Sequence, residues 1–319
     1  MAEIGKDIAK AAALLTAGKL VGIPTETVYG LAANALDVVA VTKIFEAKNR
    51  PHFDPLIVHV PDAEAAAKYA LEMPDTATAL MKRFWPGPLT ILLPKKNAVP
   101  DLVTSGLDNV GLRCPNHTLT LALLKSISFP LAAPSANPFG YVSPTTAKHV
   151  NDQLGEDVEY ILDGGECNVG IESTIVGFEN GMPHVYRLGG LSVEEIEALI
   201  GHVHLTINSV SNPLAPGQLL SHYAPHKPLL LGDINRLISE NAGRKIGVLS
   251  FRNLKLPAVI GKAIALSPAG DLDEAAQKLF SALREMDKSP IDVICAEPVP
   301  DTGLGRAIND RLRRASVNR

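Results

Sequence analysis

Lys48 and Arg50 stand two residues apart in a loop bordered by prolines and form a candidate anion-binding site. They fall at the end of an apolar helical pattern, and the loop runs on through Asp54. Arginine offers a planar fork of donors to a phosphate or carboxylate, and lysine offers a point charge. Cations at a helix end are also stabilised by the helix dipole alone. Spacing by itself leaves the anion site and the stabilised helix end equally open.

Further segments place small polar residues where predicted strands end. They are residues 24–30, 133–138 and 163–176, which read PTETVYG, APSANP and DGGECNVGIESTIV. Loops at strand ends are where α/β proteins commonly hold ligands. Each segment taken alone fits a capped turn, a proline-rich turn or a hairpin connection equally well or better. Arg113 and Arg187 end short apolar runs, and singly each predicts only a surface or ion-paired residue.

The familiar signatures of phosphate, metal and hydrolase sites are missing from the sequence. It contains no GxxxxGK[ST] loop, no GxGxxG after a strand, no HExxH and no GxSxG. The cysteines at 114, 167 and 295 are too far apart to indicate a zinc knuckle or a disulfide framework. The histidines at 202, 204, 222 and 226 lie in an irregular stretch without fixed spacing, so we expect exposed or structural histidines there.

Alternating strands and helices must position these polar segments. Apolar, β-branched runs predict strands at 20–23, 56–60, 89–93, 131–133 and 173–176. Helical apolar spacing predicts helices at 39–47, 63–71, 75–84 and 119–126. Ser192 with Glu195 is a capping box that begins another helix, which closes near Gly201. This alternation predicts an α/β architecture.

The chain loses its regular pattern after residue 205 and regains it near residue 229. Strands are predicted at 229–231, 246–250, 264–266 and 291–294, with helices at 271–286 and 305–315. We therefore predict a domain over residues 1–205, an irregular linker over 206–228 and a smaller α/β domain over 229–319.

Composition narrows the class of protein. The chain has 319 residues, of which 46% are hydrophobic and 20% charged, which favours packed domains over disorder. Its 30 Lys and Arg against 34 Asp and Glu give a net charge of −4, unlike a protein that coats nucleic acid. No apolar run reaches the ~18 residues of a membrane helix, and the N-terminus lacks a signal-peptide layout. We expect a cytoplasmic protein without a membrane partner.

Several motifs, taken in order, resemble one protein family. PTETVYGL, KNRP with a following PLIVH, WPGPLT, APSAN, DGG and ESTIV resemble the YrdC family. HYAP in the linker and GLGRAINDRLRRAS near the end resemble the long form of that family, the L-threonylcarbamoyladenylate synthases. The resemblance covers essentially the whole chain. It implies an α/β fold in which a YrdC-like catalytic domain with a twisted sheet precedes a smaller, Rossmann-like domain.

The resemblance also implies an activity. The family makes L-threonylcarbamoyladenylate from L-threonine, bicarbonate or CO2, and ATP, and releases pyrophosphate. A separate tRNA threonylcarbamoyl transferase then modifies the adenosine beside the anticodon, so tight tRNA binding by this chain is not expected. Mg²⁺ is expected to enter with ATP, held by phosphate oxygens and water rather than by protein side chains, and no organic cofactor is expected.

Site residues carry over from the family's motifs. The catalytic set that matches KxR…SxN is Lys48, Arg50, Ser135 and Asn137. The ATP-binding set is Arg50, Asp54, Asn109, Ser135, Ser143, Arg187 and Tyr223. The L-threonine-binding set is Thr27, His59, Arg113, Ala133 and Ser173. We also predict that the linker with Tyr223 acts as a lid.

The sequence departs from the family's pattern at two places. Asp54 stands where many relatives carry Asn, and a carboxylate near a triphosphate is unfavourable unless Mg²⁺ or Lys48 offsets it. Residues 218–221 lack the basic side chains that some relatives carry there.

Two other functions remain open at this stage. An RNA-binding module would use the arginines at 306, 311, 313 and 314, although a solvated face of the last helix explains them more simply. Carbamoyl transfer, as in hydrogenase-maturation proteins with a similar domain, ranks lower because the scattered cysteines cannot build those proteins' zinc sites.

Overall fold

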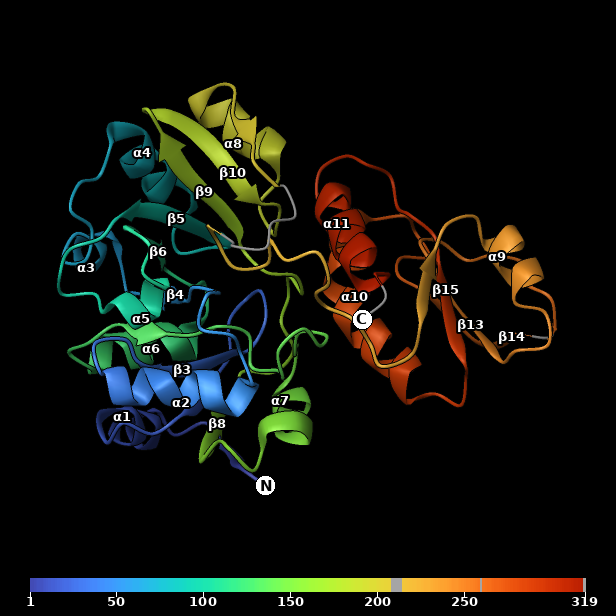
Figure 1. The fold of residues 1–319 in the computed structure, drawn as a ribbon, viewed down its shortest axis with the longest axis horizontal. Coiled ribbons are helices and arrows are strands. Elements are labelled where there is room, and N and C mark those ends of the chain that lie inside the picture. Colours follow the sequence, from blue (N-terminus) through green and yellow to red (C-terminus); the bar gives the residue numbers. More distant parts are fainter. Residues whose placement is uncertain (208–213, 259, 318–319) are drawn as a thin grey trace.

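Two β-sheets organise the chain. A computed structural model describes residues 1–207, 214–258 and 260–317. The larger sheet has eleven strands in the order β1-β8-β2-β3-β7-β4-β6-β5-β9-β10-β11, and the smaller has four in the order β12-β15-β13-β14. Figure 1 shows the larger sheet and its helices on one side, and the smaller sheet on the other, with α10 and α11 between them. The linker expected at 206–228 lies between the last strand of the first sheet and the first strand of the second, and its residues 208–213 lie outside the described residues.

Mixed strand directions run through the larger sheet. Its strands are β1 Glu3–Gly5, β2 Val21–Ile23, β3 Gly30–Asn34, β4 Ile57–His59, β5 Leu89–Pro94, β6 Asn109–Arg113, β7 Leu131–Ala132, β8 Tyr160–Leu162, β9 Thr174–Glu179, β10 Met182–Arg187 and β11 His204–Leu205. Its helices are α1 Ile8–Thr16, α2 Val38–Lys48, α3 Ala63–Ala66, α4 Asp75–Phe84, α5 Asp101–Thr104, α6 Thr118–Ser126, α7 Ala147–Leu154 and α8 Val193–Ile200. β4 pairs in parallel with β6, and β7 pairs antiparallel with both β3 and β4. This central group carries the polar loops described below.

Every strand pair in the smaller sheet is parallel. Its strands are β12 Leu229–Leu231, β13 Ile246–Ser250, β14 Ile260–Ala265 and β15 Val293–Ala296. Its helices are α9 Ile234–Glu240, α10 Leu272–Lys288 and α11 Gly305–Ala315. Parallel strands need crossover connections, which here include α9 and α10.

Side-chain caps explain where several helices begin. Asp37 accepts hydrogen bonds from the backbone N–H groups of Val39 and Ala40 at the start of α2. Ser192 and Glu195 form the predicted capping box of α8, which ends before Gly201. Such caps satisfy N–H groups that have no partner inside the helix. At the other end of α2, Asn49 adopts a left-handed conformation (φ 50°), which turns the chain into the loop that carries Arg50.

Several element boundaries differ from the sequence predictions. The helix predicted at 63–71 ends at Ala66, because Leu71 donates its N–H to Pro94 and Ala70 bridges to Lys95 at the end of β5. The predictions at 264–266 and 291–294 overlap β14 and β15 but miss their true bounds. The strand β10 was not predicted, although Asn180-Gly181 is a strong hairpin signal and both residues have positive φ.

The apolar core continues from one sheet to the other. The largest cluster of buried apolar residues contains Val28 from the large-sheet side, Tyr223 from the linker, and Phe280 from α10. We call the eleven-stranded sheet with α1–α8 the larger unit, and the four-stranded sheet with α9–α11 the smaller unit. The helix α8 packs against α4 of the larger unit.

Within the described residues, the structure has no helix whose length and apolar character would let it cross a membrane.

Candidate active site

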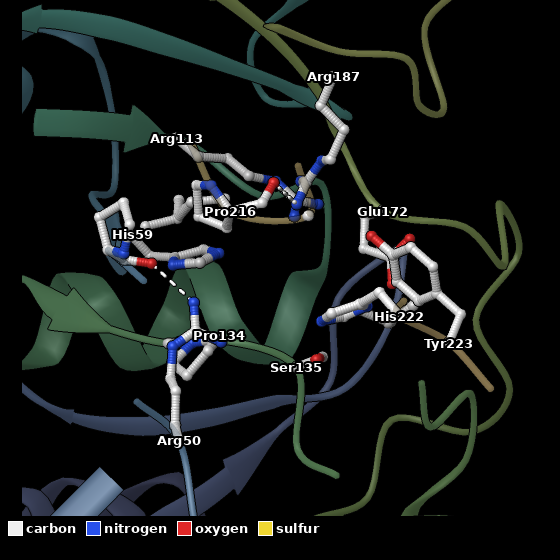
Figure 2. Close-up of a pocket in the computed structure, with 15 residues that line it drawn as sticks. Arg50, His59, Arg113, Pro134, Ser135, Glu172, Arg187, Pro216, His222 and Tyr223 are labelled. Atoms are coloured by element: carbon white, nitrogen blue, oxygen red, sulfur yellow. Dashed lines mark hydrogen bonds between the residues drawn. The ribbon is translucent and has the colours of Figure 1, made fainter. Parts of the chain in front are cut away.

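A polar pocket lies where the central strands of the larger sheet meet the linker. Its cavity volume is about 50 Å³, below the ~300–1,000 Å³ typical of small-molecule sites. Figure 2 shows Arg113 and Arg187 pointing toward one another across it, with Arg50 reaching in from the opposite side. The lining residues are Val28, Arg50, Pro55, Ile57, His59, Arg113, Ala133, Pro134, Ser135, Glu172, Arg187, Pro216, Gly217, His222 and Tyr223.

Neighbouring strands and the loop after β7 form one side of the pocket, which we call the strand wall: His59, Arg113, Ala133 and Ser135. His59 ends β4 and lies in register with Arg113, which ends β6. Ala133 and Ser135 follow β7, the strand on the other side of β4. Because β4 and β6 run parallel, their carboxyl ends meet at one edge of the sheet. Strand pairing therefore brings together residues that are far apart in the sequence.

Arg113 is buried in the strand wall with a carboxylate beside it. Its guanidinium donates to the Thr27 hydroxyl at 2.8 Å and pairs with Glu26 at 2.8 Å. Its Nε has no hydrogen-bond partner in the described part of the chain. A buried donor without a partner costs free energy unless a ligand uses it. Arg113 is thus held by its NH2 and offers Nε to an anion.

The loop after α2 holds Arg50 against the pocket. Arg50 donates to the carbonyl oxygens of Asp54 at 3.0 Å and Pro55 at 2.8 Å, and pairs with the Asp54 carboxylate at 2.9 Å. Asp54 is fully buried. Burial raises the pKa of Asp54, and Arg50 and Lys48 act in the opposite direction. Asp54 lies against Arg50 instead of lining the pocket, which separates its carboxylate from any ligand there.

Lys48 supports the neighbouring loop instead of facing the pocket. Its ammonium donates to the carbonyl of Ser135 at 2.5 Å and to the carbonyl of Asn137. Burial, with Arg50 nearby, lowers the pKa of Lys48 well below its usual value. The Asn137 amide donates to the carbonyl oxygens of Pro138 and Tyr141, each at 2.9 Å. Lys48 and Asn137 thus shape the loop that presents Ser135.

The linker forms the opposite side of the pocket, which we call the linker wall: Pro216, Gly217, His222 and Tyr223. Arg187 bridges to it, donating to the Ser173 carbonyl at 2.9 and 3.0 Å and to the Pro216 carbonyl at 3.2 Å. Gly217 and Tyr223 both have positive φ, 87° and 62°. A Cβ at Gly217 would lie 2.7 Å from the Tyr223 hydroxyl, so glycine permits this close approach.

Imidazoles on both walls are held neutral. Burial, with Arg113 nearby, lowers the pKa of His59 from 6.5 to about 3. Burial, followed by the charge of Arg50, also lowers the pKa of His222. The Nδ1 atom of each ring lacks a hydrogen-bond partner among the described residues. Each ring can therefore offer a neutral hydrogen-bonding group beside the arginines.

The pocket collects about half of the site residues predicted from sequence. Its lining includes Arg50, Ser135, Arg187, Tyr223, His59, Arg113 and Ala133. Directly behind the lining lie Thr27, which bonds to Arg113, and Ser173, which bonds to Arg187. Lys48, Asn137, Asp54 and Ser143 are buried around the pocket without lining it. Asn109 is exposed at the opposite end of β6 from Arg113 and lies outside the pocket.

Sequence reasoning missed residues that the fold brings to the pocket. Glu172 lines it and accepts from the Ser143 hydroxyl at 2.5 Å. His222 lines it too, so its interpretation as an exposed or structural histidine missed its place in the site. Arg311 in α11 pairs with Glu172 at 3.1 Å. No spacing rule connects residues 139 positions apart, although HYAP and ESTIV already marked His222 and Glu172 as members of polar segments.

The last helix corrects one sequence interpretation. Arg311 and Arg314 are buried, and both pair with Asp310. Neither a solvated face nor a basic surface patch describes them, because they point into the interface between the two units. Arg313 is exposed.

No group of three or more histidine, cysteine or acidic side chains placed to hold a metal occurs within residues 1–207, 214–258 and 260–317.

Comparisons with known proteins identify the family. The family model described as telomere recombination matches residues 13–189, and that described as the C-terminal domain of threonylcarbamoyl-AMP synthase matches residues 191–317. The threonylcarbamoyl-AMP synthase of Pyrococcus abyssi is 44% identical, over 96% of this chain and 93% of its own length. That of Bacillus subtilis is 43% identical, over 98% of this chain and 93% of its own length. The chain belongs to the threonylcarbamoyl-AMP synthase family. It is therefore an enzyme, as its motifs predicted.

Solved structures confirm the predicted fold. The crystal structure of P. abyssi Sua5 complexed with L-threonine matches with a TM-score of 0.92 at 42% identity, covering 99% of this chain and 97% of that one. The E. coli YciO structure, at 22% identity and a TM-score of 0.53, covers 59% of this chain and shows the fold alone. The boundary between the two family models precedes α8, which in this structure packs on α4 of the larger unit.

Proposed function

We propose that this enzyme makes L-threonylcarbamoyladenylate from L-threonine, bicarbonate and ATP, and releases pyrophosphate. The observation that carries the proposal is the convergence of Arg50, Arg113 and Arg187 on one pocket beside a neutral imidazole. All three substrates are anionic or carry a carboxylate, so a catalyst has to neutralise charge while aligning them. Membership of the family supports the same reaction.

The strand wall suits the amino acid. The Nε of Arg113 is an unused donor for the threonine carboxylate, and His59 can hydrogen-bond to the amine or hydroxyl. Thr27, which accepts from Arg113, and Ser173, which accepts from Arg187, add hydroxyls behind the pocket lining. A site with buried polar groups discriminates against valine, which would leave them unpaired. That the P. abyssi relative was crystallised with L-threonine supports this assignment.

The linker wall suits the nucleotide. Arg50 and Arg187 line the pocket together with Ser135 and Tyr223, and both guanidinium groups can meet phosphate oxygens. Glu172, the one carboxylate among the described lining residues, is already bonded to Ser143 and Arg311. Mg²⁺ would accordingly be held by phosphate oxygens and water, where it would neutralise charge on the triphosphate.

The reaction requires two bond-forming steps. The neutral threonine amine either attacks CO2 and loses a proton, or attacks bicarbonate with loss of water, to give a carbamate. A carbamate oxygen then attacks the α-phosphorus of ATP, and the bond to pyrophosphate breaks. The second step needs alignment and charge neutralisation more than acid–base catalysis. The linker lying over the arginines would shield the labile carbamate from water.

Pyrophosphate release tests the proposal directly. The purified protein is supplied with ATP and Mg²⁺, and threonine or bicarbonate is omitted in turn. We expect release only when both are present, with valine a poor substitute for threonine. Release that ignores threonine, or no release, would show that the chain keeps the family's scaffold but catalyses another reaction.

The product's destination belongs to the same proposal. A threonylcarbamoyl adenylate is a mixed anhydride, which a separate transferase would consume by attack of the N6 amine of a tRNA adenosine. An RNA-binding function for this chain has lost its main support, because Arg311 and Arg314 are buried. A second candidate function is therefore not favoured by any side-chain cluster in the described part of the chain.

A further inference from the structure

Arg311 in the last helix contacts two residues that line the pocket, Glu172 and Tyr223, although it belongs to the smaller unit. Its guanidinium donates to the Glu172 carboxylate at 3.1 and 3.2 Å and to the Leu188 carbonyl at 2.6 Å. The same guanidinium lies over the Tyr223 ring, 5.2 Å from its centre. Arg311 is fully buried. One side chain thus contacts Glu172 beside the strands and Tyr223 in the linker.

Other residues of the small unit reinforce this contact. Phe280 in α10 stacks on Tyr223 with 5.6 Å between ring centres. Arg284 in α10 donates to the carbonyl oxygens of Val142 and Ser143, and the Ser143 hydroxyl donates to Glu172. The two carboxylate oxygens of Glu172 are therefore used, one by Ser143 and the other by Arg311. The helices α10 and α11 therefore orient the Glu172 carboxylate, through Arg284 and Ser143, and balance its charge, through Arg311.

The linker backbone is attached to the same helix. Arg314 donates to the Leu219 carbonyl at 2.6 Å and the Ile207 carbonyl at 3.3 Å, and pairs with Asp310 at 3.1 Å. Asp310 also pairs with Arg311 at 3.2 Å. Because Arg311 and Arg314 share Asp310, one cluster of side chains in α11 contacts both Glu172 and the linker backbone.

We propose that Arg311 is a positioning residue for the nucleotide end of the pocket, acting by pairing with Glu172 and stacking on Tyr223. The inference rests on the proposed function. An unpaired carboxylate at Glu172 would repel the triphosphate across a short, poorly hydrated distance, whereas the pair with Arg311 cancels that repulsion. Tyr223, held in a left-handed conformation (φ 62°), needs contacts from outside its own segment to stay in place. The small unit is on this account a required part of the ATP site.

The test compares the effect of substituting Arg311 on ATP binding with its effect on threonine binding. Arg311→Met keeps much of the apolar stem and removes the charge, while Arg313→Met changes an exposed arginine of the same helix and serves as the matched control. We expect Arg311→Met to raise the KM and the Kd for MgATP roughly tenfold or more, and to leave the Kd for threonine within about twofold. Arg311→Lys, which keeps the charge but loses the fork, should fall between Arg311→Met and the unmodified enzyme.

A second substitution tests the mechanism. Glu172→Gln removes the carboxylate that Arg311 balances, so adding it to Arg311→Met should recover a large part of the lost ATP affinity. A purely structural role would instead lower threonine and ATP affinity together, along with the melting temperature, and the double variant would recover nothing. That result, or kinetics of Arg311→Met equal to those of Arg313→Met, would overturn the proposal.

The outcomes keep this inference apart from the proposed function. Absence of threonine-dependent pyrophosphate release from the unmodified enzyme would count against the reaction itself. Calorimetric Kd values for MgATP, measured on the same variants in the full chain, would still decide the role of Arg311.

Discussion

The two walls of the pocket are built by different means. In the strand wall, His59 and Arg113 are neighbours because β4 and β6 pair in register. In the linker wall, Pro216 and Tyr223 belong to a segment without helix or strand among its described residues 214–228. Side chains from elsewhere hold it in place: Arg187 at Pro216, and Arg314 at Leu219. One wall is rigid through backbone pairing, and the other depends on distant arginines.

The difference fits the proposed binding of threonine at the strand wall and of ATP at the linker wall. A ladder of backbone hydrogen bonds holds the strand wall, where we propose that threonine binds, in one geometry. Among its described residues 214–228, the linker has few backbone hydrogen bonds, such as that from Ala224 to the Gly140 carbonyl at 2.9 Å. Segments held mainly by side chains open at lower free-energy cost than paired strands. We therefore expect the nucleotide to enter and leave past the linker, with the strand wall unchanged.

The largest effect is expected from Arg113→Lys in the strand wall. Lysine keeps a positive charge beside Glu26 but loses the fork that would hold the threonine carboxylate. Loss of a hydrogen bond to a charged group costs ~1.5–3 kcal/mol, so the Kd for threonine should rise roughly 10- to 100-fold. Calorimetry with threonine measures it, and Arg83→Lys on the exposed side of α4 is the control. An unchanged Kd would remove Arg113 from the threonine site.

A smaller effect is expected from Gly217→Ala in the linker wall. The added Cβ would meet the Tyr223 hydroxyl at 2.7 Å, at a residue whose φ is 87°. The left-handed conformation alone costs an alanine ~1–2 kcal/mol, so the KM for ATP should rise about 5- to 30-fold while threonine affinity stays the same.

Gly181→Ala is the matched control for that variant. Gly181 also has positive φ (78°), but a Cβ there meets nothing within 4 Å. The control carries the same backbone cost in the β9–β10 turn and should leave the KM for ATP unaltered. If both variants raised it equally, general destabilisation would explain the result and the two walls would not differ in role.

The smallest effect is a change in the pH dependence of stability on substituting His59. Burial and Arg113 lower its pKa in the folded state from 6.5 to about 3, so below pH 6.5 the unfolded chain binds more protons. The contribution of the neutral His59 to the free energy of unfolding is complete above pH 6.5 and is lost as the pH falls toward 3. When the pH is lowered from about 7.5 to about 6, the free energy of unfolding should fall by about 1 kcal/mol less in His59→Gln than in the unmodified protein. Denaturant unfolding at both pH values measures this, and equal losses would contradict a neutral, buried His59.

Much of the fold follows from local patterns in the sequence. The predicted bounds are correct for the helices at 75–84 and 305–315 and for the strands at 229–231 and 246–250, because apolar spacing acts within a few residues. The helix predicted at 63–71 stops early because its last residues bond to the strand β5 and its flanking loop, a long-range competitor that propensity does not register. The strand β10 was missed because its own residues give only a weak strand pattern. Its pairing with β9 is a contact of the folded chain.

Sequence motifs alone determined the family, the α/β class and the polar segments that would surround a site. Only the tertiary structure decided which of those residues face the pocket. It turned Lys48 toward carbonyl groups, placed Asp54 behind Arg50, left Asn109 exposed, and brought Arg311 across 139 positions to Glu172. The physical reason is that residue type and spacing set what a side chain can do locally. Which partner it meets depends on strand register and on the docking of the last helices, which are set by the whole chain.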